Sequence, residues 1–102
     1  MKLDTTHNDA TNTSTVSLEG RFDAHELDPF RDKIDLLTES GVFNINVDLG
    51  GVEFLDSTAL AELVRGMKRC RENGGDLVLT SLSDPVRVIL ELTKLDAAFT
   101  IA

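Results

Sequence analysis

The sequence has one cysteine (Cys70), few basic residues and no long apolar run. A lone thiol excludes a disulfide within the chain and favours a reducing compartment. A membrane-spanning helix needs about 20 consecutive apolar residues, and no segment approaches that length. The N-terminal segment MKLDTTHNDATN is polar throughout, so it lacks the hydrophobic region of a signal peptide. These absences predict a cytoplasmic protein.

The sequence contains ten Lys and Arg residues and 18 Asp and Glu residues, which gives a formal net charge of −8. Such a surface repels phosphate backbones and anionic lipids, which disfavours binding to nucleic acid or to a membrane. Four basic residues cluster between positions 65 and 71, but a solvated helix face explains them more simply. The acidity is explained equally well by solubility alone or by a partner that carries a basic patch.

Patterns typical of catalytic and metal sites are also missing. One cysteine and the distant His7 and His25 give no zinc-binding spacing, and neither histidine stands beside a nucleophile. A Ser–His–acid triad is defined by geometry, which a sequence does not give. The pairs Gly50-Gly51 and Gly74-Gly75 lack the residues of a nucleotide fingerprint and are interpreted as turns. Asp48 lacks the carboxylates that would hold Mg²⁺ in a phosphate-receiver site. We expect no enzyme, metal or cofactor.

What is present is an ordinary globular composition, 41% apolar and 27% charged over 102 residues. This length fits one domain with one core and no deep substrate cavity. Alternating apolar and polar residues predict half-buried strands at 14–20 and 42–49. Shorter strands are expected at 2–5, 76–81 and 97–102. Gly20 is expected to end the first long strand, and Gly50-Gly51 to form a short link after the second.

Three helices are predicted from apolar residues spaced three or four apart. The first carries Leu27, Phe30, Ile34 and Leu37 and ends at Ser40-Gly41. Asp28 before Pro29 is a possible N-cap, and a start one or two residues earlier is the alternative. The second carries Leu60, Leu63, Val64, Met67 and Cys70 and ends at Asn73-Gly74-Gly75, which makes Cys70 a core thiol. The third begins at Asp84-Pro85. Strands that alternate with helices predict a partly parallel sheet with helices packed on it.

One segment carries candidate chemistry: FLDSTAL, residues 54–60, between the second long strand and the second helix. Asp56 or Ser57 is expected to cap that helix by accepting a bond from a backbone N–H. Ser57 also lies at an exposed junction, where a phosphate would add about −2 charges at the positive end of the helix dipole. The fold should tolerate that group, whereas a protein partner facing it would lose affinity. Many helices begin Asp-Ser-Thr, so the motif is weakly specific by itself.

FLDSTAL resembles the signature of the STAS domain in bacterial anti-sigma factor antagonists, in which the phosphorylated serine directly follows the aspartate. The segments LEGRFDA, ENGGDLVL and SDPVRVILELTKLDAAFTI resemble further parts of the family in the same order, so the similarity covers nearly the whole chain. The resemblance implies an α/β STAS fold over residues 1–102. That fold has a single mixed sheet of four to five strands with three to four helices packed against it, in the order ββαβαβαβ.

The resemblance also implies a partner-switching regulator. The unphosphorylated protein would bind an anti-sigma factor that is a serine kinase, and this would free a sigma factor. Phosphorylation of Ser57 would release the complex, and a PP2C-type phosphatase would reset it. ATP belongs to the kinase, so the chain itself needs no cofactor. The residues expected to bind the partner are Asp23, Asp56, Ser57, Thr58 and Ala59, in a monomer or weak dimer.

Two positions and one alternative stay open at this stage. Ala59 stands where the family usually has glycine, and because alanine is small we expect the change to affect access to Ser57 more than the fold. Asp23 is either an interface residue or a cap or turn acceptor. Related STAS proteins serve in stressosomes or as small subunits of lipid ABC transporters. Partner binding without a phosphate switch is therefore the alternative function.

Overall fold

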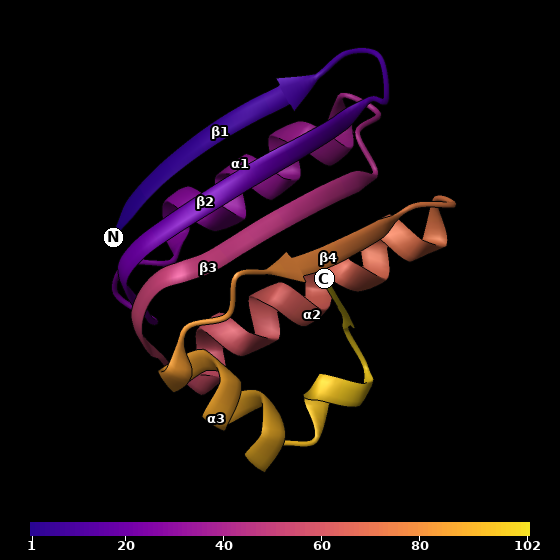
Figure 1. Cartoon of the computed structure of the whole chain (residues 1–102). Helices are drawn as coiled ribbons and strands as arrows, with labels where there is room; N and C mark the ends of the chain where they lie inside the picture. The colour runs from indigo at the N-terminus through magenta and orange to yellow at the C-terminus, as the bar shows by residue number, and fades with distance from the viewer.

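The computed structural model describes all 102 residues and contains the predicted elements in the predicted order (Figure 1). The bounds of the strands and helices are β1 Lys2–Asn8, β2 Thr13–Phe22, α1 Asp28–Glu39, β3 Asn44–Leu55, α2 Ser57–Glu72, β4 Asp76–Thr80, α3 Asp84–Leu92 and β5 Thr100–Ile101, with a 3-10 turn at Leu95–Ala97. The strands form one sheet in the order β1-β2-β3-β4-β5. β1 is antiparallel to β2, and the other neighbours are parallel. The mixed α/β sheet is therefore confirmed.

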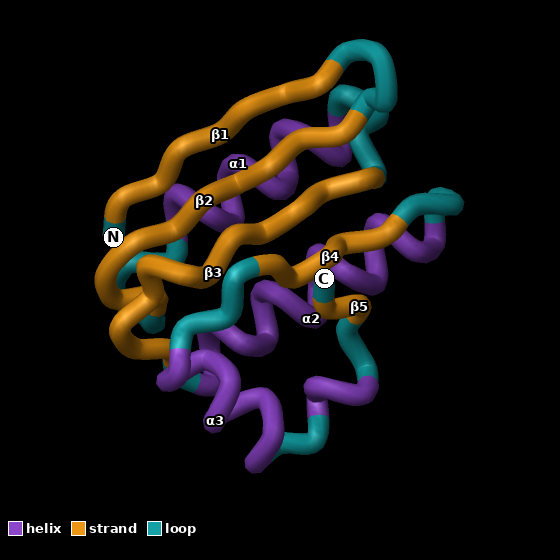
Figure 2. Tube along the Cα trace, in the orientation of Figure 1, coloured by secondary structure: helices purple, strands orange, loops and turns teal.

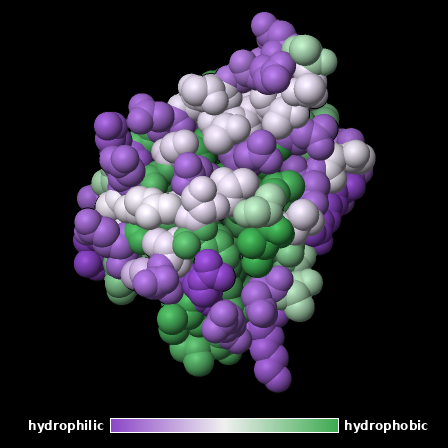
Figure 3. Space-filling model, in the orientation of Figure 1, coloured by the Kyte–Doolittle hydropathy of each residue, from purple (hydrophilic) through white to green (hydrophobic).

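The core lies between the sheet and the helices behind it (Figure 2). Along β3 the buried Ile45, Val47 and Leu49 alternate with Asn46 and Asp48, which face the other side. Successive strand residues point to opposite faces, so this alternation makes one face dry and leaves the other open. Figure 3 views the open face: it is polar over the strands, and hydrophobic atoms gather towards α3.

The first helix begins one residue earlier than a cap at Asp28 would place it. Its N-cap is Leu27, and Asp28 is already helical, because the Leu27 carbonyl accepts the first helical bond from Arg31 N at 3.0 Å. The Leu27 side chain is buried in the core, which fixes this residue at the helix entrance. Asp28 instead forms an ion pair with Arg31 at 3.1 Å. Of the two predicted possibilities, the structure therefore has the earlier start and not the Asp28 cap.

The second helix agrees with the sequence pattern. Its buried stripe includes Leu60, Leu63, Met67 and Cys70, and Asn73 is its C-cap. Burial raises the pKa of the Cys70 thiol to about 11. Cys70 is fully buried, which confirms the predicted core thiol, and a thiol with a raised pKa is a poor nucleophile at neutral pH. No helix in the structure is long and apolar enough to cross a membrane.

Two of the predicted glycine breaks are wrong. β2 continues through Gly20 to Phe22, and β3 continues through Gly50-Gly51 to Leu55. The β2–β3 pairing contains register shifts here, so glycine accommodates bulges instead of ending strands. Gly20 has φ +91°, and a Cβ on Gly51 would lie 2.7 Å from Glu19 Cγ. Gly74, by contrast, forms the expected turn with φ +83°.

Candidate functional site

Two loops meet where β2 and β3 end. Phe22 pairs with Leu55 in the parallel ladder, so the chain leaves both strands at the same edge of the sheet. The backbone N–H of Asp56 donates to the Phe22 carbonyl at 3.4 Å. As a result, the loop of residues 23–27 lies beside the start of α2 and its FLDSTAL segment.

Asp56 connects these two loops through its carboxylate. Oδ1 accepts a hydrogen bond from Ala59 N at 2.9 Å, and Oδ2 accepts one from Ala24 N at 3.0 Å. The N-cap is therefore Asp56, and Ser57 is the first helical residue. The bond from Ala59 N–H is the largest cause of a lowered pKa of Asp56, opposed by desolvation and assisted by the N–H of Ala24. Hydrogen bonds that stabilise the ionised form lower a carboxyl pKa.

Asp23 organises the neighbouring loop. Its Oδ1 accepts hydrogen bonds from His25 N and Glu26 N, both at 3.1 Å, and its Oδ2 pairs with Arg21 Nε at 3.2 Å. The residue is buried, so of its two predicted roles the structure displays the turn acceptor. The buried Asp23 carboxylate thus fixes the conformation of the 23–27 loop, which lies beside Asp56.

The exposed part of the site consists of Ser57 and Thr58 on the first turn of α2. The Asp56 carboxylate already serves as the cap, and the Ser57 hydroxyl makes no hydrogen bond within the chain. Ala59 lies differently from the expectation: its side chain is fully buried in the core, and its N–H bonds to Asp56. The structure therefore removes the Ala59 side chain from the exposed surface and leaves the hydroxyls of Ser57 and Thr58 on it.

Comparison with known proteins identifies the family. The family model described as "Mlab, STAS domain" matches residues 5–101. The chain belongs to the STAS domain family. The anti-sigma-B factor antagonist of Bacillus subtilis (strain 168) is 30% identical over 84 residues, which is 82% of this chain and 76% of that protein.

Solved structures with a similar fold include an anti-sigma factor antagonist. This STAS domain resembles an anti-sigma-factor antagonist (STAS) domain protein from Planctomyces limnophilus with a TM-score of 0.83 and 25% identity, covering 97% of this chain and 87% of that one. The Bacillus cell fate determinant SpoIIAA in its phosphorylated form has the same fold, with a TM-score of 0.74 and 20% identity over 99% of this chain and 89% of that chain.

The sequence did not point to two further residues at the edge of this STAS domain's site. The Arg21 guanidinium lies 4.3 Å from the centroid of the Phe54 ring, and the ring is 40% exposed. A cation over an aromatic face is attracted by the ring quadrupole. Strict alternation of buried and exposed residues does not predict that Phe54 is exposed, because the bulges interrupt this alternation in β3. In that part of β3 the side chains of Val52 and Leu55 are buried, and Phe54 is on the surface.

Proposed function

We propose that this STAS domain is an anti-sigma factor antagonist that works by partner switching in the cytoplasm. Its unphosphorylated form binds an anti-sigma factor that is a serine kinase, and a sigma factor is thereby freed. Phosphorylation of Ser57 ends the complex, and a PP2C-type phosphatase restores the binding form. The kinase brings the ATP, and this chain is its substrate. The observation that supports this most is the exposed Ser57 hydroxyl directly after a capping aspartate.

The division of roles between Asp56 and Ser57 makes a phosphate tolerable inside the domain. Asp56 supplies the cap, so modification of Ser57 removes no hydrogen bond on which α2 depends. A phosphate on the first residue of a helix meets backbone N–H groups and the positive end of the helix dipole. We therefore expect the phosphorylated domain to keep its fold.

The same phosphate is unfavourable at a protein interface. It adds about −2 charges beside the Asp56 carboxylate, and a partner surface shaped for the free hydroxyl must desolvate them. The Arg21–Phe54 stack borders this surface, and arginine and aromatic side chains are frequent anchors of interfaces. We therefore expect phosphorylation of Ser57 to lower the affinity for the partner, and we expect Arg21 and Phe54 to contribute part of the contact surface.

The test is phosphorylation in vitro by the anti-sigma factor kinase of the same organism, with ATP and site mapping by mass spectrometry. We expect phosphate on Ser57 and none in a Ser57→Ala variant. Thr58→Ala is the matched control, because it removes the neighbouring exposed hydroxyl and should leave phosphorylation intact. Phosphorylated protein should bind the kinase at least about tenfold more weakly, which corresponds to ~1.4 kcal/mol.

Modification of Thr58 instead of Ser57, or undiminished binding by the phosphorylated protein, would contradict the switch. If a Ser57→Ala variant supports normal regulation in cells while Phe54→Ala abolishes partner binding, the domain binds constitutively. It would then be a scaffold of the stressosome type or a small transporter subunit. Aspartate at position 57 carries less charge than phosphate, so phosphorylated protein is the better probe.

A further inference from the structure

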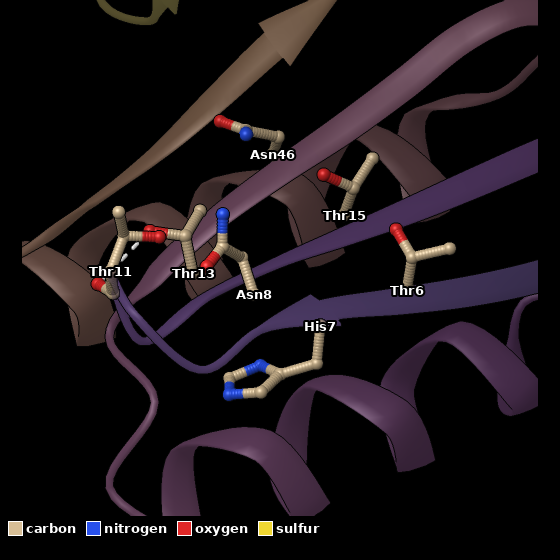
Figure 4. Close-up of a pocket in the computed structure, with 7 residues that line it drawn as sticks. All are labelled: Thr6, His7, Asn8, Thr11, Thr13, Thr15 and Asn46. Carbon is tan, nitrogen blue, oxygen red and sulfur yellow. Dashed lines mark hydrogen bonds between the residues drawn. The ribbon is translucent and has the colours of Figure 1, made fainter.

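A hollow lies on the open face of the sheet, away from Ser57. It has a volume of about 450 Å³ and is lined by Thr6, His7, Asn8, Thr11, Thr13, Thr15 and Asn46 (Figure 4). β2 and β3 are parallel and begin beside this hollow, whereas they end beside Asp56. The hollow therefore lies at the opposite end of the sheet from the exposed surface formed by Ser57 and Thr58, called the Ser57 surface below.

The floor of the hollow is a row of three polar side chains from three adjacent strands. Thr6 pairs with Thr15, and Thr15 pairs with Asn46, so the three residues stand side by side. Neighbouring strands are about 4.8 Å apart, which sets the spacing of this row. Thr15 and Asn46 are half-buried, and none of the three side chains hydrogen-bonds to another residue drawn in the hollow (Figure 4). The row thus presents free donors and acceptors.

The wall of the hollow is the turn between β1 and β2, and it is held in place. Asn12 Nδ2 donates to the Gly41 carbonyl at 3.2 Å, and Asn8 Oδ1 accepts from Ala10 N at 3.0 Å. His7 contributes only its backbone, because its ring lies on the helix side of the sheet and Nδ1 lies 2.6 Å from Ser14 Oγ (Figure 4). The groups that face the hollow are therefore hydroxyls and amides.

The charge pattern selects the kind of ligand. No side chain that faces the hollow is charged, although the chain carries a net charge of −8. Asp4 and Asp48 stand in the next row of the same face, and neither forms an ion pair. Asp76, in the row on the other side, is paired with Arg71 at 2.9 Å and contributes little net charge. The Asp4 and Asp48 carboxylates repel anions, which disfavours phosphates and nucleotides. Hydroxyl and amide groups both donate and accept hydrogen bonds, as the hydroxyls of an uncharged sugar require.

We propose that this hollow binds a neutral cyclic polyol such as a monosaccharide. Its hydroxyls would hydrogen-bond to Thr6, Thr15 and Asn46, and its C–H groups would lie against threonine methyl groups. A volume of about 450 Å³ is within the usual range of small-molecule sites. The lining contains no aromatic ring, so the affinity rests on hydrogen bonds exchanged with water and is expected to be in the millimolar range.

The test is a titration of ¹⁵N-labelled protein with D-glucose and with myo-inositol, followed by NMR. At least one of them should cause saturable shifts confined to Thr6, Thr15, Asn46 and their neighbours. Glucose 6-phosphate should bind at least several-fold more weakly because of the surrounding carboxylates. Thr15→Val and Asn46→Leu should each weaken binding several-fold. Ser17→Ala is the matched control, on the same strand and face but outside the lining.

Absence of saturable shifts with both polyols would overturn the proposal. So would shifts that persist unchanged in both Thr15→Val and Asn46→Leu, provided that each variant melts at the temperature of the unmodified chain. Equal binding of glucose 6-phosphate would show that the site does not select neutral ligands. Ser57→Ala should bind the polyol normally, so the result does not depend on the switch proposed for Ser57.

Discussion

At the scale of single residues, the geometry of Asp56 determines what its neighbour can do. The sequence left the cap to either Asp56 or Ser57, and only the structure shows Asp56 bonded to both Ala59 N and Ala24 N. Asp56 therefore fixes the helix start and joins it to the loop of residues 23–27. The Ser57 hydroxyl makes no hydrogen bond within the chain, and it is held on the first turn of α2, whose start Asp56 fixes.

Replacing Asp56 by alanine should destabilise the domain by about 1–2 kcal/mol, the usual effect of losing an N-cap side chain. Urea unfolding followed by circular dichroism measures this difference. Ser57→Ala is the control on the same turn and should change the free energy of unfolding by less than about 0.5 kcal/mol. An Asp56→Ala variant as stable as the Ser57→Ala control would show that the two bonds contribute nothing.

Asp56→Asn tests the charge in the same experiment. The pKa of Asp56 in the folded protein is lower than its ordinary value of 3.8, so its ionised form stabilises the fold above that pH. This contribution should be lost as the pH falls through the lower folded pKa. The stability difference between the unmodified chain and Asp56→Asn should accordingly shrink in acid. A difference that stays constant there would assign the effect to the shape of the side chain alone.

At the scale of elements, periodicity predicted the helices and most strand positions, but it failed at the bulges. Apolar alternation gave β3 as far as Leu49, and there Gly50-Gly51 was taken for its end. Whether a glycine breaks a strand or fits a bulge depends on its neighbours across the sheet: a Cβ on Gly50 would lie 3.0 Å from the Ser81 carbonyl. Such neighbours are distant in sequence. The same bulges explain why Phe54 was missed.

A second glycine position gives a test at this scale. A Cβ on Gly75 would overlap the Phe43 carbonyl, which accepts the bond from Asp76 N at 3.0 Å where β4 begins. Gly75→Ala should therefore displace the backbone and lower the free energy of unfolding by about 2 kcal/mol or more. Gly74→Ala is the control: it meets open space and should show only the smaller strain of a positive φ. A larger loss for Gly74→Ala would contradict this.

At the scale of the whole molecule, the topology separates two surfaces of different chemistry. The Ser57 surface lies where parallel strands end, and it was predictable because its motif follows a strand that the sequence itself indicates. The polar hollow depends on the register of β1 with β2 and of β2 with β3, which joins Thr6 to Thr15 and Asn46. No local pattern contains that register, so the open polar face was predictable and its hollow was not.

The two surfaces should differ in their response to salt. The net charge of −8 steers a basic partner towards the domain, and screening shortens the range of this attraction to about 8 Å at 0.15 M salt and ~3 Å at 1 M. The association rate with the proposed kinase partner, measured by stopped flow, should therefore fall about tenfold or more over this range. Polyol binding involves an uncharged ligand and should hardly change. A salt-independent association rate would mean that the partner's contact surface is not basic and that the acidity of this chain serves only its solubility.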